Sequence, residues 1–295
     1  MPPEEPADSA APRSRRRALF DLALVTAIIG AQIPSPAAVR AVTVSREPHS
    51  PTPTPTPMPL ADGRTLHFLG FDTAPTSGLL TRIAAEVDSA VAAVVSFWGD
   101  DWSREVVFVA ANSAAQFTAW TRWPSGPQWV DVAAAAVADT VDPARRIATG
   151  QRMVFAPGAA RMSDAALRIV LRHELLHYAT RADTAMDAPR WLAEGVADFV
   201  GRPAAPKPGL AASDKLAHLP ADADFDGVGS AQSLAYDRAW WFARFIADRY
   251  GTAALKQLYV RAGGAAHLDS TTALRDVLGT EEAQLFSLWR CWLAR

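Results

Sequence analysis

Residues 173–177 read His-Glu-Leu-Leu-His, within a segment whose apolar spacing predicts a helix over 164–180. Residues four apart share one face of a helix, so His173 and His177 can point at the same ion. Neutral imidazole is a good ligand for Zn²⁺. Glu174 points to the side of that face, in position to act on water that the metal activates. The pattern favours a zinc site over its alternative, two core histidines satisfied by hydrogen bonds.

A third ligand is expected on the next predicted helix, which covers 189–200. Residues 191–198 read Trp-Leu-Ala-Glu-Gly-Val-Ala-Asp, which puts Glu194 17 residues after His177. A helix–turn–helix can bring Glu194 to the same metal, and this ligand set leaves the open fourth position that a catalytic zinc requires. Asp198 lies one turn later, where it can accept a hydrogen bond from a ligand histidine and fix its tautomer. The alternative for Glu194, a solvated carboxylate, is disfavoured by its apolar neighbours, because an unpaired buried carboxylate is costly.

The two motifs at residues 173–177 and 191–198 resemble those of the gluzincin zinc metallopeptidases of the peptidase MA-like type. The resemblance covers residues 150–250 well and 60–295 loosely. It implies a zincin-like (thermolysin-like) domain, one catalytic Zn²⁺, and a peptide or protein substrate whose identity it leaves open.

The resemblance also implies a role for each matching residue. It makes His173, His177 and Glu194 the zinc ligands. Glu174 becomes the general base and then the proton donor to the leaving amine. Asp198 becomes the carboxylate that contacts a metal ligand and not the metal itself.

Gluzincins often place a Tyr or a His where it stabilises the oxyanion of the tetrahedral intermediate. Residues 235–240 read Ala-Tyr-Asp-Arg-Ala-Trp, and Tyr236 resembles that element at the start of the following helix. A phenol donor there would act on developing charge, and an amphipathic packing role is an equal alternative. His218 is a weaker candidate for the same task. Tyr178 is turned about 100° from its neighbour His177 on the helix and is expected to pack.

Residues 152–156 form a predicted strand directly before the metal helix. In gluzincins the equivalent edge strand binds the extended substrate backbone, which implies substrate contacts from Met153, Val154 and Phe155. An unpaired edge presents alternating N–H and C=O groups, which suits that role. The alternative is a central strand that is fully paired.

Around these motifs, the periodicity predicts strands first and helices later, an α+β layout with a small N-terminal sheet. The predicted strands cover 66–69, 105–110, 130–141 and 152–156. The predicted helices cover 76–98, 113–120, 164–180, 189–200, 211–219, 230–250, 252–262, 271–278 and 281–295.

The N-terminal part of the chain has a different composition, with 12 of the 22 prolines in its first 59 residues. Residues 1–44 hold a basic cluster and then an apolar run, and 18–33 is short for a spanning helix but long enough for a signal peptide. We expect export or a membrane tether, hence an extracytoplasmic location, with a disordered tail as the alternative. The composition of residues 45–59 predicts a Pro/Thr-rich linker. Residues 60–295 are expected to form the peptidase-like domain.

Composition excludes several other classes of protein. Hydrophobic residues make up 49% of the chain, which is enough for a core and excludes disorder of the whole chain. The 29 basic residues balance 31 acidic ones, which gives no electrostatic case for binding nucleic acid. The single cysteine excludes a disulfide framework and a cysteine-ligated metal. The oligomeric state is not predictable.

Two weaker signals have ordinary explanations. Residues 222–227 read Asp-Ala-Asp-Phe-Asp-Gly and open like a calcium loop, but the twelfth position is Ser233, so a turn is favoured. The ten tryptophans favour core packing over a sugar-binding surface.

Two functions other than a zinc peptidase stay open. One is a non-catalytic binding module on the same scaffold, which the presence of Glu174 disfavours. The other is a zinc hydrolase that acts on a non-peptide amide or ester, and no feature of the sequence separates it from a peptidase.

Overall fold

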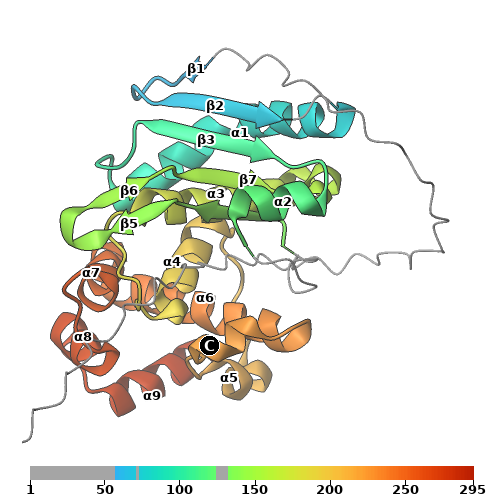
Figure 1. Ribbon diagram of the computed structural model, residues 1–295. Helices are drawn as coiled ribbons and strands as arrows, with labels where there is room; N and C mark the ends of the chain where they lie inside the picture. The colour runs from blue at the N-terminus through green and yellow to red at the C-terminus, as the bar shows by residue number, and fades with distance from the viewer. Residues whose placement is uncertain (1–56, 71–72, 124–131) are drawn as a thin grey trace, which may run out of the picture.

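The computed structural model describes residues 57–70, 73–123 and 132–295. Within these ranges, a small sheet forms first and a mainly helical half follows (Figure 1). The expected α+β layout is therefore confirmed.

The main sheet has five strands in the order β1-β2-β3-β7-β4. β2, β3 and β7 run parallel, and β1 and β4 are antiparallel to their neighbours. The near-continuous apolar run of β3 suits a strand that is covered on both faces. The strands are β1 (Met58–Pro59), β2 (Thr65–Gly70), β3 (Glu105–Ala110), β4 (Ala134–Val137) and β7 (Arg152–Phe155).

The prediction that residues 152–156 form an edge strand is wrong. β7 lies between β3 and β4, and it is hydrogen-bonded to both. Met153, Val154 and Phe155 are fully buried, which removes them as contacts for an added substrate strand. All four residues of β7, including Arg152, are buried, as is typical of a central strand that is covered on both faces. The edge next to α3 (Asp164–Thr180) is β4 instead.

The predicted strand over 130–141 is divided in the structure. β4 ends at Val137, and β5 (Thr140–Asp142) pairs with β6 (Ile147–Thr149) in a separate hairpin. Arg146 turns the chain in this hairpin with a φ of 54°, in the left-handed region. Residues 130 and 131 lie outside the described ranges.

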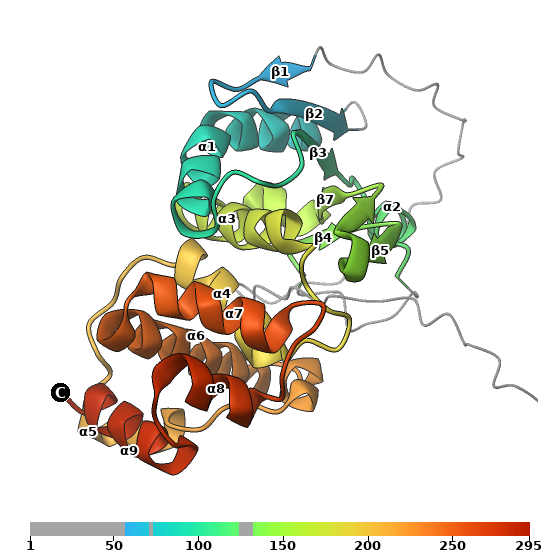
Figure 2. The same ribbon diagram turned by 90° about the vertical axis from the view of Figure 1, so that its left-hand side faces the viewer.

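Helices cover both faces of the sheet. α1 (Ala74–Trp98) and α3 lie on one face, and α2 (Ala114–Thr121) lies on the other (Figure 2). The buried side chains of α1 recur every three or four residues, so one apolar stripe of the helix packs against the sheet and α3.

The helical half packs against the far side of α3 from the sheet (Figure 1). Its central contact joins α4 and α6, where Gly195 allows a close approach. A Cβ atom at Gly195 would lie 2.5 Å from the carbonyl oxygen of Ala239. Its α-helices are α4 (Arg190–Gly201), α5 (Leu210–Leu216), α6 (Ser230–Tyr250), α7 (Thr252–Gly263), α8 (Ser270–Leu278) and α9 (Glu282–Leu293).

The sheet begins slightly before the expected domain boundary at residue 60, because Met58 and Pro59 pair with β2. The segment 1–44, with its export or anchor prediction, and residues 45–56 of the predicted linker lie outside the described ranges. Among the helices that the structure does describe, none combines the length and the apolar character needed to cross a membrane.

Candidate metal centre

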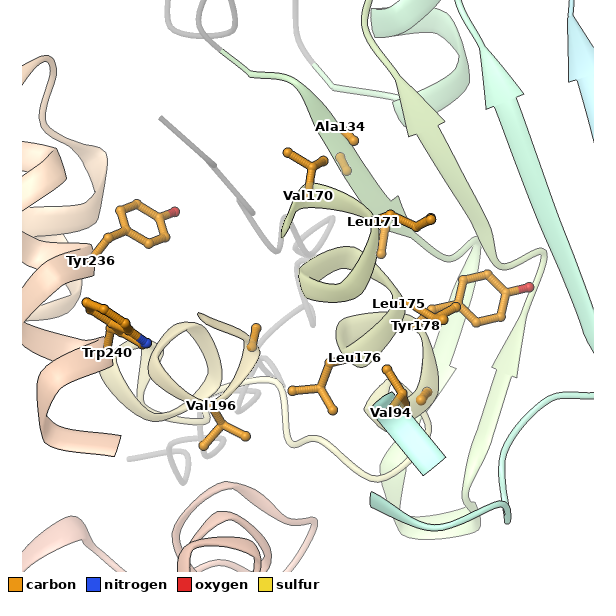
Figure 3. Close-up of a cluster of buried hydrophobic side chains, with 14 of the residues drawn as sticks. Val94, Ala134, Val170, Leu171, Leu175, Leu176, Tyr178, Val196, Tyr236 and Trp240 are labelled. Carbon is orange, nitrogen blue, oxygen red and sulfur yellow. The ribbon is translucent and has the colours of Figure 1, made fainter. Parts of the chain in front are cut away.

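The metal helix α3 begins where the sequence places its cap. The Ser163 hydroxyl accepts a hydrogen bond from the backbone N–H of Ala166, and Asp164 lies in the first turn, where its charge complements the helix dipole. His173 and His177 lie on the same face in the second half of the helix. Leu176, between them in sequence, points from α3 toward α4 (Figure 3). The histidines therefore lie in the packed seam between two helices.

Glycine lets the second motif approach this seam closely. Gly201, at the end of α4, has no Cβ, and one built there would lie 3.0 Å from the carbonyl oxygen of Ile169 and 3.3 Å from the Cβ of His173. The turn of α3 that carries His173 therefore lies directly against the end of α4. This packing brings Glu194 and Asp198 beside the two histidines.

Three side-chain atoms converge in the seam. The Nε2 atoms of His173 and His177 lie 3.1 Å apart. The Glu194 Oε2 atom lies 3.2 Å from the first Nε2 and 3.5 Å from the second. All three residues are between 0% and 5% exposed. The structure thus brings together the ligand set that the sequence predicts.

The triangle fits a tetrahedral zinc ion. Zinc bonds of about 2.0–2.1 Å place neighbouring ligand atoms roughly 3.3 Å apart, close to the three distances observed. Two imidazole nitrogens and one carboxylate oxygen are also a ligand set that zinc prefers. Among the described residues, this is the one group of three or more such side chains that could hold a metal.

The protonation of the cluster also points to a cation. Burial lowers the pKa of His173, but hydrogen bonds to Asp198 and Glu194 outweigh it and raise the pKa to about 10. Burial raises the pKa of Glu194, yet the charge and hydrogen bonds of the two histidines bring it down to about 2. Two buried carboxylates therefore hold positive charge on His173, and a metal cation would supply the same charge.

Asp198 contacts His173 from the side opposite the triangle. The Nδ1–H of His173 donates to the Oδ1 of Asp198 over 2.9 Å, which leaves Nε2 for a metal. The structure therefore confirms the predicted proximity of these two side chains.

Glu174 lies beside the triangle without joining it. Its Oε2 atom accepts a hydrogen bond from the backbone N–H of Ala136 in β4, over 2.8 Å. Its Oε1 atom is buried and has no hydrogen-bond partner within the described part of the chain. Burial raises the pKa of Glu174 to about 7 against the opposing charges of His173 and His177. This carboxylate can therefore exchange a proton near neutral pH.

The remaining predicted site residues differ in their positions. Tyr236 is buried in α6, and its ring packs edge-on against Phe225 with centroids 5.1 Å apart. In Figure 3, its hydroxyl points away from α6 toward the side of α3. Tyr178 donates to the backbone oxygen of Glu105 and packs against the sheet, as expected. His218 is exposed on the segment after α5.

The Asp-rich segment is a turn, as favoured. It forms a 3₁₀ helix (Asp222–Asp226) in which Asp222 and Asp226 accept hydrogen bonds from Arg190. Asp224 accepts from the backbone of Ala221. Its carboxylates are therefore already engaged by the protein.

Two contacts at the site were missed by sequence reasoning. One is the N–H of Ala136, because a backbone donor leaves no trace in residue type. The other is Arg202, which lies beside Asp198. Its signal was available, since Gly-Arg-Pro at residues 201–203 follows the second motif after two intervening residues.

No family model matches the chain, and no curated protein matches it. Among solved structures, the chain is similar to a point mutant of an M1 zinc metallopeptidase from Deinococcus radiodurans, with 14% identity and a TM-score of 0.44. The match covers 81% of this chain and 51% of that one, so the chain spans about half the length of the structure it matches.

Proposed function

We propose that this chain is a zinc-dependent peptidase with a zincin-like domain. The observation that carries the proposal is the triangle formed by His173, His177 and Glu194. Its three atoms lie 3.1, 3.2 and 3.5 Å apart in a buried seam. Beside them lies the Oε1 atom of Glu174, which has no hydrogen-bond partner among the described residues. Three protein ligands leave a fourth position for water or substrate, as in catalytic zinc sites.

Zinc held there would supply Lewis-acid polarisation of a carbonyl oxygen and would lower the pKa of water. Glu174 would take the proton of the attacking water on Oε1 and pass it to the nitrogen of the leaving amine. In the metal-free protein, burial raises the pKa of Glu174, which strengthens this carboxylate as a proton acceptor. The hydrogen bond from Ala136 holds the other oxygen and so orients the carboxylate.

Two further side chains would assist. Asp198 would keep His173 in the tautomer whose Nε2 faces the metal. The hydroxyl of Tyr236 would donate to the oxyanion as negative charge develops on the substrate oxygen. The support for Tyr236 is its burial on α6 and the direction of its hydroxyl (Figure 3).

The substrate would be a peptide or protein in extended form. With β7 central, the substrate-binding role moves to β4, which has no further strand partner among the described residues. β4 also contacts Glu174 through Ala136, so a strand added there would run past the catalytic carboxylate.

We also propose that the domain works outside the cytoplasm. The support is the order of a basic cluster, an apolar run over 18–33 and a proline-rich spacer. Fractionation of cells that express the full chain tests this, and recovery from the cytoplasm alone would contradict it.

The function is tested with the full chain, loaded with zinc and incubated with a mixed peptide pool. Glu174→Gln should retain zinc and lose about 10²–10⁴-fold in cleavage rate, because only the proton acceptor is removed. Glu281→Gln, at an exposed position, serves as the matched control and should cleave normally. Equal cleavage by the parent and Glu174→Gln would contradict the assigned role, and zinc binding without cleavage by either would favour a binding module.

A further inference from the structure

Arg202 lies where α4 ends, and its backbone follows from the two residues beside it. Gly201 allows α4 to lie against α3, and Pro203 disfavours helical backbone at the residue before it. Arg202 is accordingly extended, with φ −83° and ψ 145°, while its N–H still donates to the oxygen of Asp198 over 2.8 Å. The chain leaves the helix here, and the Arg202 side chain turns back toward Asp198.

The guanidinium of Arg202 bridges two carboxylates on different helices. Its Nη2 atom lies 2.5 Å from the Oδ2 of Asp198, and its Nη1 atom donates to the Oδ1 of Asp237 over 2.9 Å. Its Cζ atom lies 5.0 Å from the ring centroid of Trp240. Only 10% of the side chain is exposed. The bridge is therefore a built, largely buried contact between α4 and α6.

These contacts form one continuous line. His173 on α3 donates to Asp198 on α4, Asp198 pairs with Arg202, and Arg202 pairs with Asp237 on α6. Asp237 directly follows Tyr236 in the sequence. The line thus joins a metal ligand to the helix segment that carries the proposed oxyanion donor.

We propose that Arg202 is a positioning residue of the zinc centre. It holds Asp198, so that Asp198 orients His173, and it ties α6 to the same point through Asp237. This inference deepens the proposed function and rests on it.

The burial of Asp198 explains why this role needs a cation. Asp198 is 1% exposed, and the bond to His173 occupies only its Oδ1 atom. A buried carboxylate that loses its charged partner is strongly destabilised, and without Arg202 the Asp198 side chain is expected to turn toward water. That movement weakens its hold on His173. The planar fork of an arginine can serve two carboxylates at once, whereas a lysine ammonium reaches one well.

Arg244 provides a matched control, because it contacts the same tryptophan. Its Cζ atom lies 5.2 Å from the Trp240 ring, and its Nη1 atom donates to the backbone oxygen of Ala205. Replacing Arg244 removes an arginine–indole contact of the same kind but leaves Asp198 untouched. A difference between variants at the two positions therefore reports on the link to the metal ligand.

The test measures zinc affinity of the full chain by competition with a chelator. Supports of metal ligands typically contribute 10–100-fold, so Arg202→Met should weaken zinc binding by about 10-fold or more. Arg244→Met should stay near the parent. Thermal unfolding of the metal-free proteins checks that both variants are folded. With cobalt in place of zinc, the visible spectrum should change in Arg202→Met alone.

Equal zinc affinity in Arg202→Met and Arg244→Met would overturn the inference. If Arg202→Met does not fold, Arg202→Lys and Arg244→Lys give the same comparison, with a several-fold loss expected only in the first. A parent protein that binds no zinc would instead overturn the proposed function, so the two failures are distinguishable.

Discussion

The helical half buries two regions of opposite character. Where α3 crosses α4, the buried groups are imidazoles and carboxylates within 3.5 Å of one another. Between α6 and α9 the buried groups are aromatic, and the ring centroid of Phe242 lies 4.8 Å from Trp289 and 6.2 Å from Phe286. Phe242 and Trp289 are as buried as the residues at the α3–α4 crossing, but only the crossing consists of groups that prefer water.

The difference indicates which region stabilises the fold and which would serve the proposed chemistry. Burial of aromatic surface is favourable by itself and accounts for the α6–α9 layer. Burial of ionisable groups costs free energy, which their mutual contacts offset only in part. A bound cation would complete that compensation at the α3–α4 crossing. Changes in the aromatic layer should therefore alter stability, and changes at the crossing should alter metal binding.

The largest expected effect is on the aromatic side. Trp289 is fully buried, so Trp289→Ala should lower the free energy of unfolding by about 3–5 kcal/mol. The folded fraction should still bind zinc, because Trp289 is not among the groups around the metal cluster. Urea unfolding and metal analysis of the same sample measure both quantities. Loss of zinc from a folded Trp289→Ala protein would contradict the claim that the aromatic layer and the metal cluster act separately.

Zinc itself should stabilise the protein. A ligand that binds only the folded state at 100 times its dissociation constant adds about 2.7 kcal/mol to the free energy of unfolding. The same increment is expected in the parent and in Trp289→Ala, because the two regions act separately. Unfolding with zinc and with a chelator measures the increment. An absent increment in both proteins would contradict zinc binding at the crossing.

The contact between α4 and α6, which lies between the two regions, can be tested at Gly195. In Gly195→Ala the new Cβ would meet the backbone of Ala239 at 2.5 Å, so α4 must move away from α6. We expect a loss of about 1–3 kcal/mol in stability, together with weaker zinc binding, because Glu194 adjoins the shift. Gly78→Ala is the matched control, since its Cβ meets open space on helix α1. Equal stability of the two variants would show that the close approach is unimportant.

The smallest expected effect is the pH dependence of zinc binding. The pKa of His173 in the metal-free protein is raised to about 10, so Nε2 carries a proton at pH 8 and must lose it to bind zinc. Zinc affinity should therefore rise about tenfold, or 1.4 kcal/mol, per pH unit between pH 8 and 9.5, and level off near pH 10. Calorimetry in buffers of different ionisation enthalpy should show about one proton released per zinc at pH 8. Binding without proton release would contradict the charged state of His173.

The local elements of the metal centre could be predicted well from the sequence. α3 follows the predicted bounds because Ser163 caps it and its apolar residues recur at helical spacing. The spacing of His173, His177 and Glu194 was also enough to predict that the three side chains meet, because a helix–turn–helix leaves few ways to arrange them. The zincin-like fold and the roles of these residues stay proposals.

The errors concern contacts between distant segments. The pattern of β7 does not say which strands flank it, and the alanines of β4 gave a weak strand signal for the true edge. Arg202 was missed for a similar reason. Its partner Asp237 lies 35 residues away and meets it only once α6 packs on α4.

The most direct test of the central claim is the zinc content of three full-length proteins purified in parallel. We predict about one zinc per chain in the parent and in Glu174→Gln, and a large loss of zinc in Glu194→Gln. The reason is that Glu194 is one of the three proposed ligands and Glu174 is not. Equal zinc in Glu194→Gln and the parent, or no zinc in the parent, would contradict the account.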